Sequence, residues 1–150
     1  MAKIVVERQK VIARPLDVVQ AQFVDMQHHA KVGVHAALNV SEVRPQPSGC
    51  RAKATRRVLG TLDVDEIEVT RHPGGNSTLR SVAGSNEGLE VRQAFQRVDE
   101  GHTRVSLHVE VPLRGMRRWI APLMWLGVWL DTVRALEEDR RDLEVLGYPR

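Results

Sequence analysis

Three histidines lie close together in the first quarter of the chain, at His28, His29 and His35. Imidazole is the side chain whose charge changes near neutral pH, and it is a common metal ligand. These residues could therefore hold a metal or transfer protons at the mouth of a ligand site. On a helix, His28 and His29 would point about 100° apart, and no cysteine or carboxylate cluster completes a ligand set. We expect no metal; His29 and His35 are the candidates for a polar site, and solvent-exposed histidines are the simpler alternative.

A run of four acids, Asp63, Asp65, Glu66 and Glu68, falls on one predicted strand. Strict alternation would put Asp63 and Asp65 on one face and the two glutamates on the other. A buried pair of carboxylates could carry out acid–base chemistry. A bulge in the middle of the strand would instead turn all four acids toward solvent, and this is the arrangement that we expect.

Four further polar residues matter only if their strands point them inward: Arg56, Arg80, Arg92 and Gln93. An inward arginine would suit the carboxylate or enolate of a ligand. On an outer face the same residues would form ordinary charged ladders. Gln93 shares its side of the strand with the apolar Val91, which predicts a polar group inside a cavity that could orient a ligand.

The composition is that of a soluble globular protein. The length of 150 residues suits one domain, 1–150, and 42% hydrophobic with 27% charged residues is not typical of disorder. A net charge of +3 is too small to indicate a nucleic-acid binder, and a single cysteine excludes an intramolecular disulfide. The longest apolar stretch, 119–130, is shorter than the roughly 20 residues of a membrane span. With no signal-peptide pattern at the N-terminus, we expect a cytoplasmic protein.

Short strands separated by turn residues make up most of the chain. A strand over 3–13 is followed by Pro15, which favours a helix start, and by two short helices over about 16–23 and 25–31. Regular spacing of the later strands favours an antiparallel meander. These six predicted strands cover 35–44, 50–59, 62–71, 77–83, 89–98 and 102–111.

The last part of the chain changes to a helical period. We expect a short helical turn and then a main helix from about Pro122 to Leu146. Trp125 and Trp129 lie off its main apolar stripe, so this helix is apolar nearly all round. The outer side could be a homodimer interface, a lipid-surface contact or a face covered by loops. The stripe itself, which we expect to face the sheet, consists of Trp119, Leu123, Leu126, Leu130 and Val133.

Together these elements predict an α+β domain in which a curved antiparallel sheet of about seven strands wraps the long C-terminal helix. A cavity can remain between the sheet and the helix. Its predicted lining comprises Phe23, Leu38, Val40, Ala54, Leu79, Val91, Gln93, Phe95, Leu107, Trp119, Leu123 and Leu126.

Several stretches resemble a known superfamily. The segment 11–19 resembles its first strand running into a helix that starts with proline, and 23–26 resembles the end of that helix. The segments 101–105 and 112–115 are similar to the turn into its last strand and the entry to its last helix. The chain thus resembles the START-related SRPBCC superfamily with its helix-grip fold. The resemblance implies a hydrophobic ligand cavity, and because the superfamily has no shared catalytic signature it assigns no catalytic residue.

Three functions remain open on this basis. The first is binding of a hydrophobic small molecule, such as a lipid, polyketide or isoprenoid, without a cofactor. The second is a polyketide cyclase, aromatase or dehydratase type of enzyme that uses the same cavity, and a polar cluster around Gln93 and His29 would favour it. The third is a partner-binding or stress-related protein that acts through the apolar face of its C-terminal helix.

Overall fold

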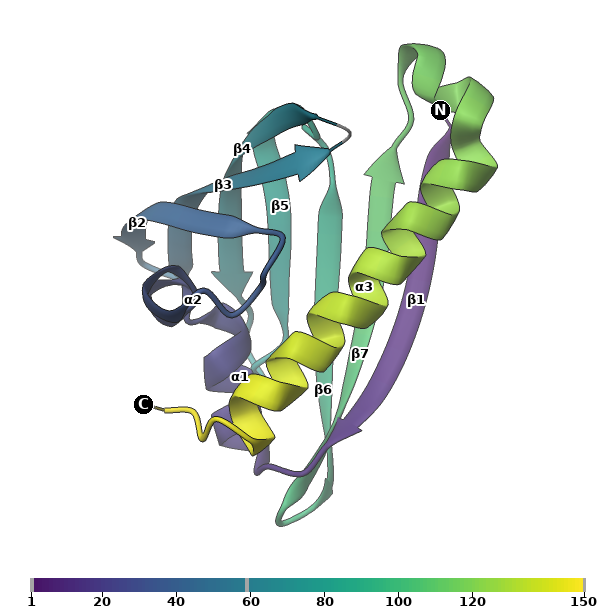
Figure 1. The fold of residues 1–150 in the computed structure, drawn as a ribbon. Helices are drawn as coiled ribbons and strands as arrows, with labels where there is room; N and C mark the ends of the chain where they lie inside the picture. The colour runs from purple at the N-terminus through teal and green to yellow at the C-terminus, as the bar shows by residue number, and fades with distance from the viewer. Residues whose placement is uncertain (1, 59, 150) are drawn as a thin grey trace.

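A seven-stranded antiparallel sheet curves beside one long helix, α3 (Figure 1). The structure, a computed structural model, describes residues 2–58 and 60–149. The strand order is β1-β7-β6-β5-β4-β3-β2, so the first strand pairs with the last. The strands are β1 Lys3–Ile12, β2 Asn39–Gln46, β3 Gly49–Val58, β4 Thr61–Arg71, β5 Ser77–Gly84, β6 Glu90–Asp99 and β7 His102–Pro112. The helices are α1 Leu16–Val24, α2 Met26–Val32, the 3₁₀ helix η1 Gly115–Ile120 and α3 Ala121–Glu144.

This architecture confirms the predicted fold class and order of elements. The predicted alternation is clearest in β7, where Val105, Leu107, Val109 and Val111 are all buried and the residues between them are partly exposed. One face of the sheet therefore packs inward and the other meets water. The predicted strand over 35–44 begins later, at Asn39, because 33–38 forms an irregular loop.

Local capping fixes the position of α2. The Asp25 side chain accepts a hydrogen bond from the backbone N–H of His28 at 3.0 Å, which satisfies one free donor of the first turn. Gly33 ends the helix with φ of +63°, a left-handed conformation that glycine adopts without strain. The two caps place both histidines of α2 on a seven-residue helix that packs at one end of the sheet.

The inner face of α3 packs against β1 and β7. Near the helix start, Met124, Val128 and Trp129 cover an apolar cluster that includes Ile4 and Val109. Farther along, Leu136 and Leu143 are buried in a second cluster, which α1 and β7 complete. None of the described helices carries an apolar stretch long enough to cross a membrane.

The apolar stripe predicted to face the sheet lies instead on the outer side of α3. Leu123 is 66% exposed, Leu126 45% and Leu130 46%, while Trp119 belongs to η1 and is 87% exposed. The period of the stripe was predicted correctly and its direction was wrong. At 100° per residue the stripe lies opposite Val128 and its buried neighbours, because the helix is apolar on both sides and the inner side carries the packing.

The two tryptophans assigned to the outer side lie against β1. The Trp125 indole N–H donates to the backbone carbonyl of Val5 at 3.2 Å. The Arg8 guanidinium lies 5.2 Å from the centre of the Trp129 ring, a cation–π distance. These contacts give both tryptophans partial cover from β1, and Trp125 remains 44% exposed.

Candidate functional site

The concave wall of the sheet is set by strand register. Val109, Val91, Leu79 and Val69 occupy successive Cα pairs across β7, β6, β5 and β4. Val109 and Val69 are buried, but the two residues between them are only partly buried. In this row the inner wall is therefore least covered at β5 and β6.

The residues predicted to line a cavity divide into three groups. Phe23, Gln93 and Leu107 are buried on or beside the central strands, and Val40 and Ala54 are buried near β2. The exposed members, Trp119, Leu123 and Leu126, lie on the outer side of the helical segment and are not brought to the wall. The partly buried members are Leu38, Leu79, Val91 and Phe95.

A polar pair interrupts the apolar wall at β5 and β6. Gln93 is buried, and its side-chain oxygen accepts a hydrogen bond of 2.5 Å from the Ser77 hydroxyl. Both residues lie on the inner face, since Gln93 is the register partner of the buried Leu107. Within the described part of the chain, no group bonds the Gln93 amide nitrogen, which leaves a donor for a ligand.

The sequence leaves the direction of Arg56, Arg80 and Arg92 open, and of these three only Arg56 points inward. Arg56 forms an ion pair with Asp131 of α3, so it reaches from β3 to the helix. Its Nε is buried and has no hydrogen-bond acceptor in the described structure. Arg80 and Arg92 instead form ion pairs with Glu90 along the sheet.

The expectation that all four acids face solvent was wrong for Asp65. Its buried carboxylate accepts hydrogen bonds from the Ser81 hydroxyl at 2.8 Å and from the backbone and side-chain nitrogens of Asn86 at 2.7 and 2.9 Å. The register shift lies in the pairing of β4 with β5, where Glu66 pairs with Ala83 but the next residue pairs with Ser81. The extra residue therefore belongs to β5, and β4 keeps strict alternation.

The histidines of α2 are buried, so the simpler alternative that they are exposed to solvent is wrong. His28 is 7% exposed, and its Nε2 lies 2.7 Å from Oδ2 of Asp142. Its ring meets that of Tyr148 with centroids 4.7 Å apart. Since Asp142 lies on α3, this contact ties α2 to the C-terminal helix.

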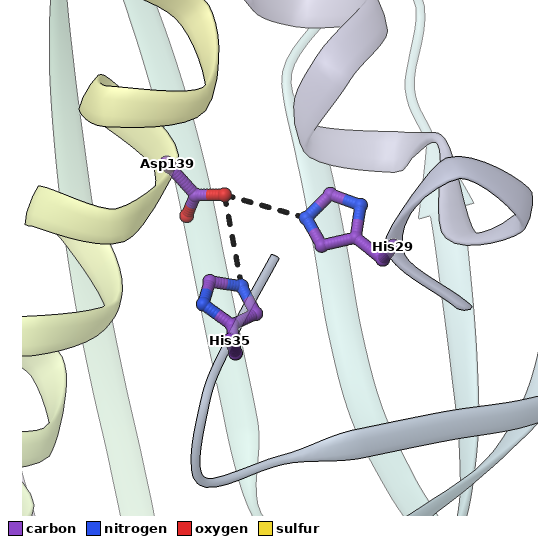
Figure 2. Close-up of side chains that lie close together, drawn as sticks. All are labelled: His29, His35 and Asp139. Carbon is purple, nitrogen blue, oxygen red and sulfur yellow. Dashed lines mark hydrogen bonds and ion pairs between the residues drawn. The ribbon is translucent and has the colours of Figure 1, made fainter. Parts of the chain in front are cut away.

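His29 and His35 converge on one carboxylate, that of Asp139 (Figure 2). The Nε2 atoms of His29 and His35 lie 3.3 and 3.6 Å from Asp139 Oδ1. Burial alone would lower the pKa of His29, but its hydrogen bond to Asp139 and the charge of that carboxylate raise the pKa above its ordinary value. Burial would likewise raise the pKa of Asp139, but the two imidazoles lower it.

Sequence reasoning missed the acids of this cluster because they lie 110 and 114 residues from their histidines. The structure brings His29 and His35 to one carboxylate, and the partners of His29 are Asp139 and the backbone oxygen of Asp25 rather than Gln93. Gln22 is a further missed member: its amide nitrogen donates to Asp139 at 3.0 Å and to Asp142 at 3.1 Å.

Two surface pockets lie near opposite ends of the helical segment that follows β7. One of about 230 Å³ separates the turn after β5 from η1. The other, of about 270 Å³, lies where the C-terminus of α2 meets α3 and is lined by Val32, Gly33, Val34, Glu138, Arg141, Asp142 and Leu146.

Comparison with solved structures places this arrangement among known folds. No protein-family model matches the sequence, and no curated protein matches it. The Zhui aromatase/cyclase from a Streptomyces species is similar over 97% of this chain and 99% of its own, with a TM-score of 0.75 and 14% identity. The fold is the helix-grip fold. A START superfamily protein from Mycobacterium smegmatis matches with a TM-score of 0.70 and 14% identity, over 93% of this chain and 98% of its own. Norcoclaurine synthase from Thalictrum flavum matches with a TM-score of 0.73 and 8% identity, over 96% and 95%. These matches confirm the predicted likeness in fold to START-type proteins.

Proposed function

We propose that this protein binds a hydrophobic small molecule, such as a lipid, polyketide or isoprenoid, between the inner wall of the sheet and α3. The observation that carries the proposal is the incomplete burial of the inward-facing Leu79 and Val91, which lie between buried residues of the same row. Covering apolar surface contributes roughly 25 cal/mol for each Å² removed from water. An apolar ligand would gain that free energy at this wall.

Polar groups of the same face would orient the ligand. The amide nitrogen of Gln93 is a donor held in place by the bond from Ser77 to the other end of the amide. Arg56 reaches toward α3 from β3, and its buried Nε lacks an acceptor among the described residues. A carboxylate or enolate oxygen on the ligand would suit both groups.

The fold neighbours support this choice of ligand class by analogy only. One is named an aromatase/cyclase and another belongs to the START superfamily, both below 25% identity. They support an apolar or polyketide-like ligand, and the identity of that ligand is part of the proposal.

A cyclase or dehydratase type of activity is the second candidate. It is favoured by three polar residues that face inward from β3, β4 and β6, namely Arg56, Asp65 and Gln93. It is disfavoured by His29, which pairs with Asp139 at the α2–α3 junction instead of joining Gln93. Turnover of a poly-β-keto substrate by the purified protein, lost in Arg56→Met, would establish this candidate over simple binding.

Partner binding or self-association is the third candidate. It is favoured by the exposed apolar row on α3, where Leu123 is 66% and Leu126 45% exposed. Analytical ultracentrifugation of the protein and of Leu126→Glu tests it: a dimer that the substitution converts to monomer would support this use of the helix.

The test of the primary proposal is native mass spectrometry of the freshly purified protein, followed by titration with an apolar fluorescent probe. Val91→Trp would fill the inner wall, and Ala94→Trp would place the same ring on the exposed side of the same strand. The larger ring in Val91→Trp would occupy space that the probe needs, and crowding of a packed site costs about 1–3 kcal/mol. We therefore expect Val91→Trp to weaken probe binding roughly tenfold or more and Ala94→Trp to leave it unchanged. Equal binding by both variants would place the ligand elsewhere.

A further inference from the structure

Three side chains from three separate segments bring metal-ligating atoms together where α2 meets α3 (Figure 2). His29 comes from α2, His35 from the loop that precedes β2, and Asp139 from α3. Their ligand atoms all lie within 4.8 Å of one another. We propose that these three residues bind a divalent transition metal of the zinc class.

The spacing of the ligand atoms fits such an ion. With metal–ligand bonds of about 2.0–2.1 Å, the ligands of a tetrahedral zinc site lie roughly 3.3 Å apart. The two distances to Asp139 Oδ1 are 3.3 Å from His29 and 3.6 Å from His35. His35 lies in an irregular loop, so it can complete the approach without moving a helix.

Each imidazole also has the outer partner that metal-binding histidines require. Nδ1 of His29 lies 2.8 Å from the backbone oxygen of Asp25, and Nδ1 of His35 lies 3.3 Å from Oε1 of Glu138. When Nδ1 carries the proton and donates it to these acceptors, Nε2 keeps a lone pair on the side of Asp139 with which it can bind the ion. Glu138 also accepts a hydrogen bond from the backbone of Ala36 at 2.9 Å, which fixes the loop that carries His35.

The buried charge of the junction and an unpaired hydrogen-bond acceptor in it also favour a bound cation. Asp139 is 5% exposed, and a buried carboxylate needs a cationic partner. A divalent ion would supply that charge while both imidazoles stay neutral. The side-chain oxygen of Gln22 is buried with no donor in the described structure, although its nitrogen bonds Asp139 and Asp142. A water on the metal is a donor of the kind that this oxygen lacks.

The donor types indicate which ions the junction would take. Two imidazole nitrogens and one carboxylate suit zinc, cobalt and related ions, whereas magnesium and calcium prefer oxygen ligands. Three protein ligands leave one position for water. A pocket of about 270 Å³ lies beside this junction and is lined in part by Glu138, the outer partner of His35.

The experiment uses the full chain without an affinity tag, treated with a chelator and then titrated with Co²⁺ and with Zn²⁺. We expect one Co²⁺ per chain, visible d–d absorption of a tetrahedral site, displacement by Zn²⁺, and a rise in Tm on binding. His35→Ala removes a partly exposed loop ligand, and Asp139→Asn changes the carboxylate with little change of shape. Glu138→Gln changes an outer partner and should weaken Co²⁺ binding roughly 10–100-fold. His35→Ala and Asp139→Asn remove a ligand and should weaken Co²⁺ binding by at least as much.

His72→Ala is the matched control, because His72 is exposed and its Nε2 lies 2.7 Å from the Thr78 hydroxyl within a turn. It should bind Co²⁺ as the unchanged protein does. Circular dichroism shows whether each variant folds. Absence of stoichiometric Co²⁺ binding by the unchanged protein, or equal binding by folded His35→Ala, would overturn the proposal. The titration needs no apolar ligand, so its result is independent of the proposed function.

Discussion

The buried carboxylate of Asp65 offers a quantitative test of how the sheet positions the start of the C-terminal helix. It bonds the Ser81 hydroxyl and two nitrogens of Asn86, at distances between 2.7 and 2.9 Å. The side-chain oxygen of Asn86 in turn accepts a hydrogen bond of 3.2 Å from Arg117 of η1. Asp65 therefore connects β4 to the turn after β5 and, through that turn, to the segment that leads into α3.

Asp65→Ala would remove all three bonds, although the Ser81 hydroxyl and the Asn86 amide each keep a longer bond, to the Ala83 carbonyl at 3.4 Å and to Asp63 at 3.2 Å. A hydrogen bond to a charged group contributes roughly 1.5–3 kcal/mol, so three of them could exceed 4 kcal/mol. Water can reach Asn86 because the adjacent Ser85 and Glu87 are exposed, which recovers part of that loss. We expect the free energy of unfolding to fall by about 3–4 kcal/mol. For a chain of this length the fall corresponds to a Tm lower by about 10 °C.

Urea denaturation followed by tryptophan fluorescence measures this loss. Asp63→Ala is the matched control, because Asp63 makes a single bond of 3.2 Å to Asn86. It should cost less than about 1 kcal/mol. A double-mutant cycle between Asp65→Ala and Asn86→Ala should give a coupling of about 1–3 kcal/mol. A loss below about 1 kcal/mol for Asp65→Ala, or a coupling near zero, would refute the assignment of this carboxylate as a structural link.

Three further outcomes follow from the packing and the surface charges. Leu143→Ala should lower the free energy of unfolding by about 2–5 kcal/mol in urea titrations, because Leu143 is fully buried. Trp125→Phe removes the hydrogen bond to the Val5 carbonyl and should cost about 0.5–1.5 kcal/mol in the same assay. The bond to Glu110 raises the pKa of His108 above its ordinary value of 6.5. The stability from that pair is thus present below pH 6.5 and lost as the pH rises through the higher folded pKa. NMR titration should show the His108 midpoint falling in Glu110→Gln.

The sheet could be predicted from the sequence because its signals are local. Alternation in β7 and the turn residues between strands depend only on neighbouring positions, and the structure confirms them. The inward direction of Arg56 and Asp65 could not be settled in this way. A single extra residue reverses the facing of a strand, and the sequence does not reveal which strand of a pair carries it.

The main error of the sequence analysis concerns which side of the C-terminal helix faces the sheet. The spacing of the stripe through Leu123 and Leu126 predicts that it faces the sheet, although the structure leaves both residues exposed. Residues of moderate size such as Met124 and Val128 do the inner packing, and they carry a weaker hydrophobic signal. Hydrophobic periodicity identifies a helix reliably, but it cannot choose between two apolar faces.

The orientation of α3 about its axis also decides whether the histidine cluster can be predicted from the sequence. Asp139 lies three residues after Leu136 and four before Leu143, so it belongs to the side of α3 that those leucines bury. Asp142 lies three residues after Asp139 and extends that side. When the stripe is placed inside, this side turns to solvent and its acids look ordinary. When the side of α3 that carries Leu136 and Leu143 faces inward, two carboxylates enter the core and require partners. The residues free to meet them are on α2 and its following loop, which pack at that end of the sheet and carry the histidines. The polar junction thus follows from the correct helix phase.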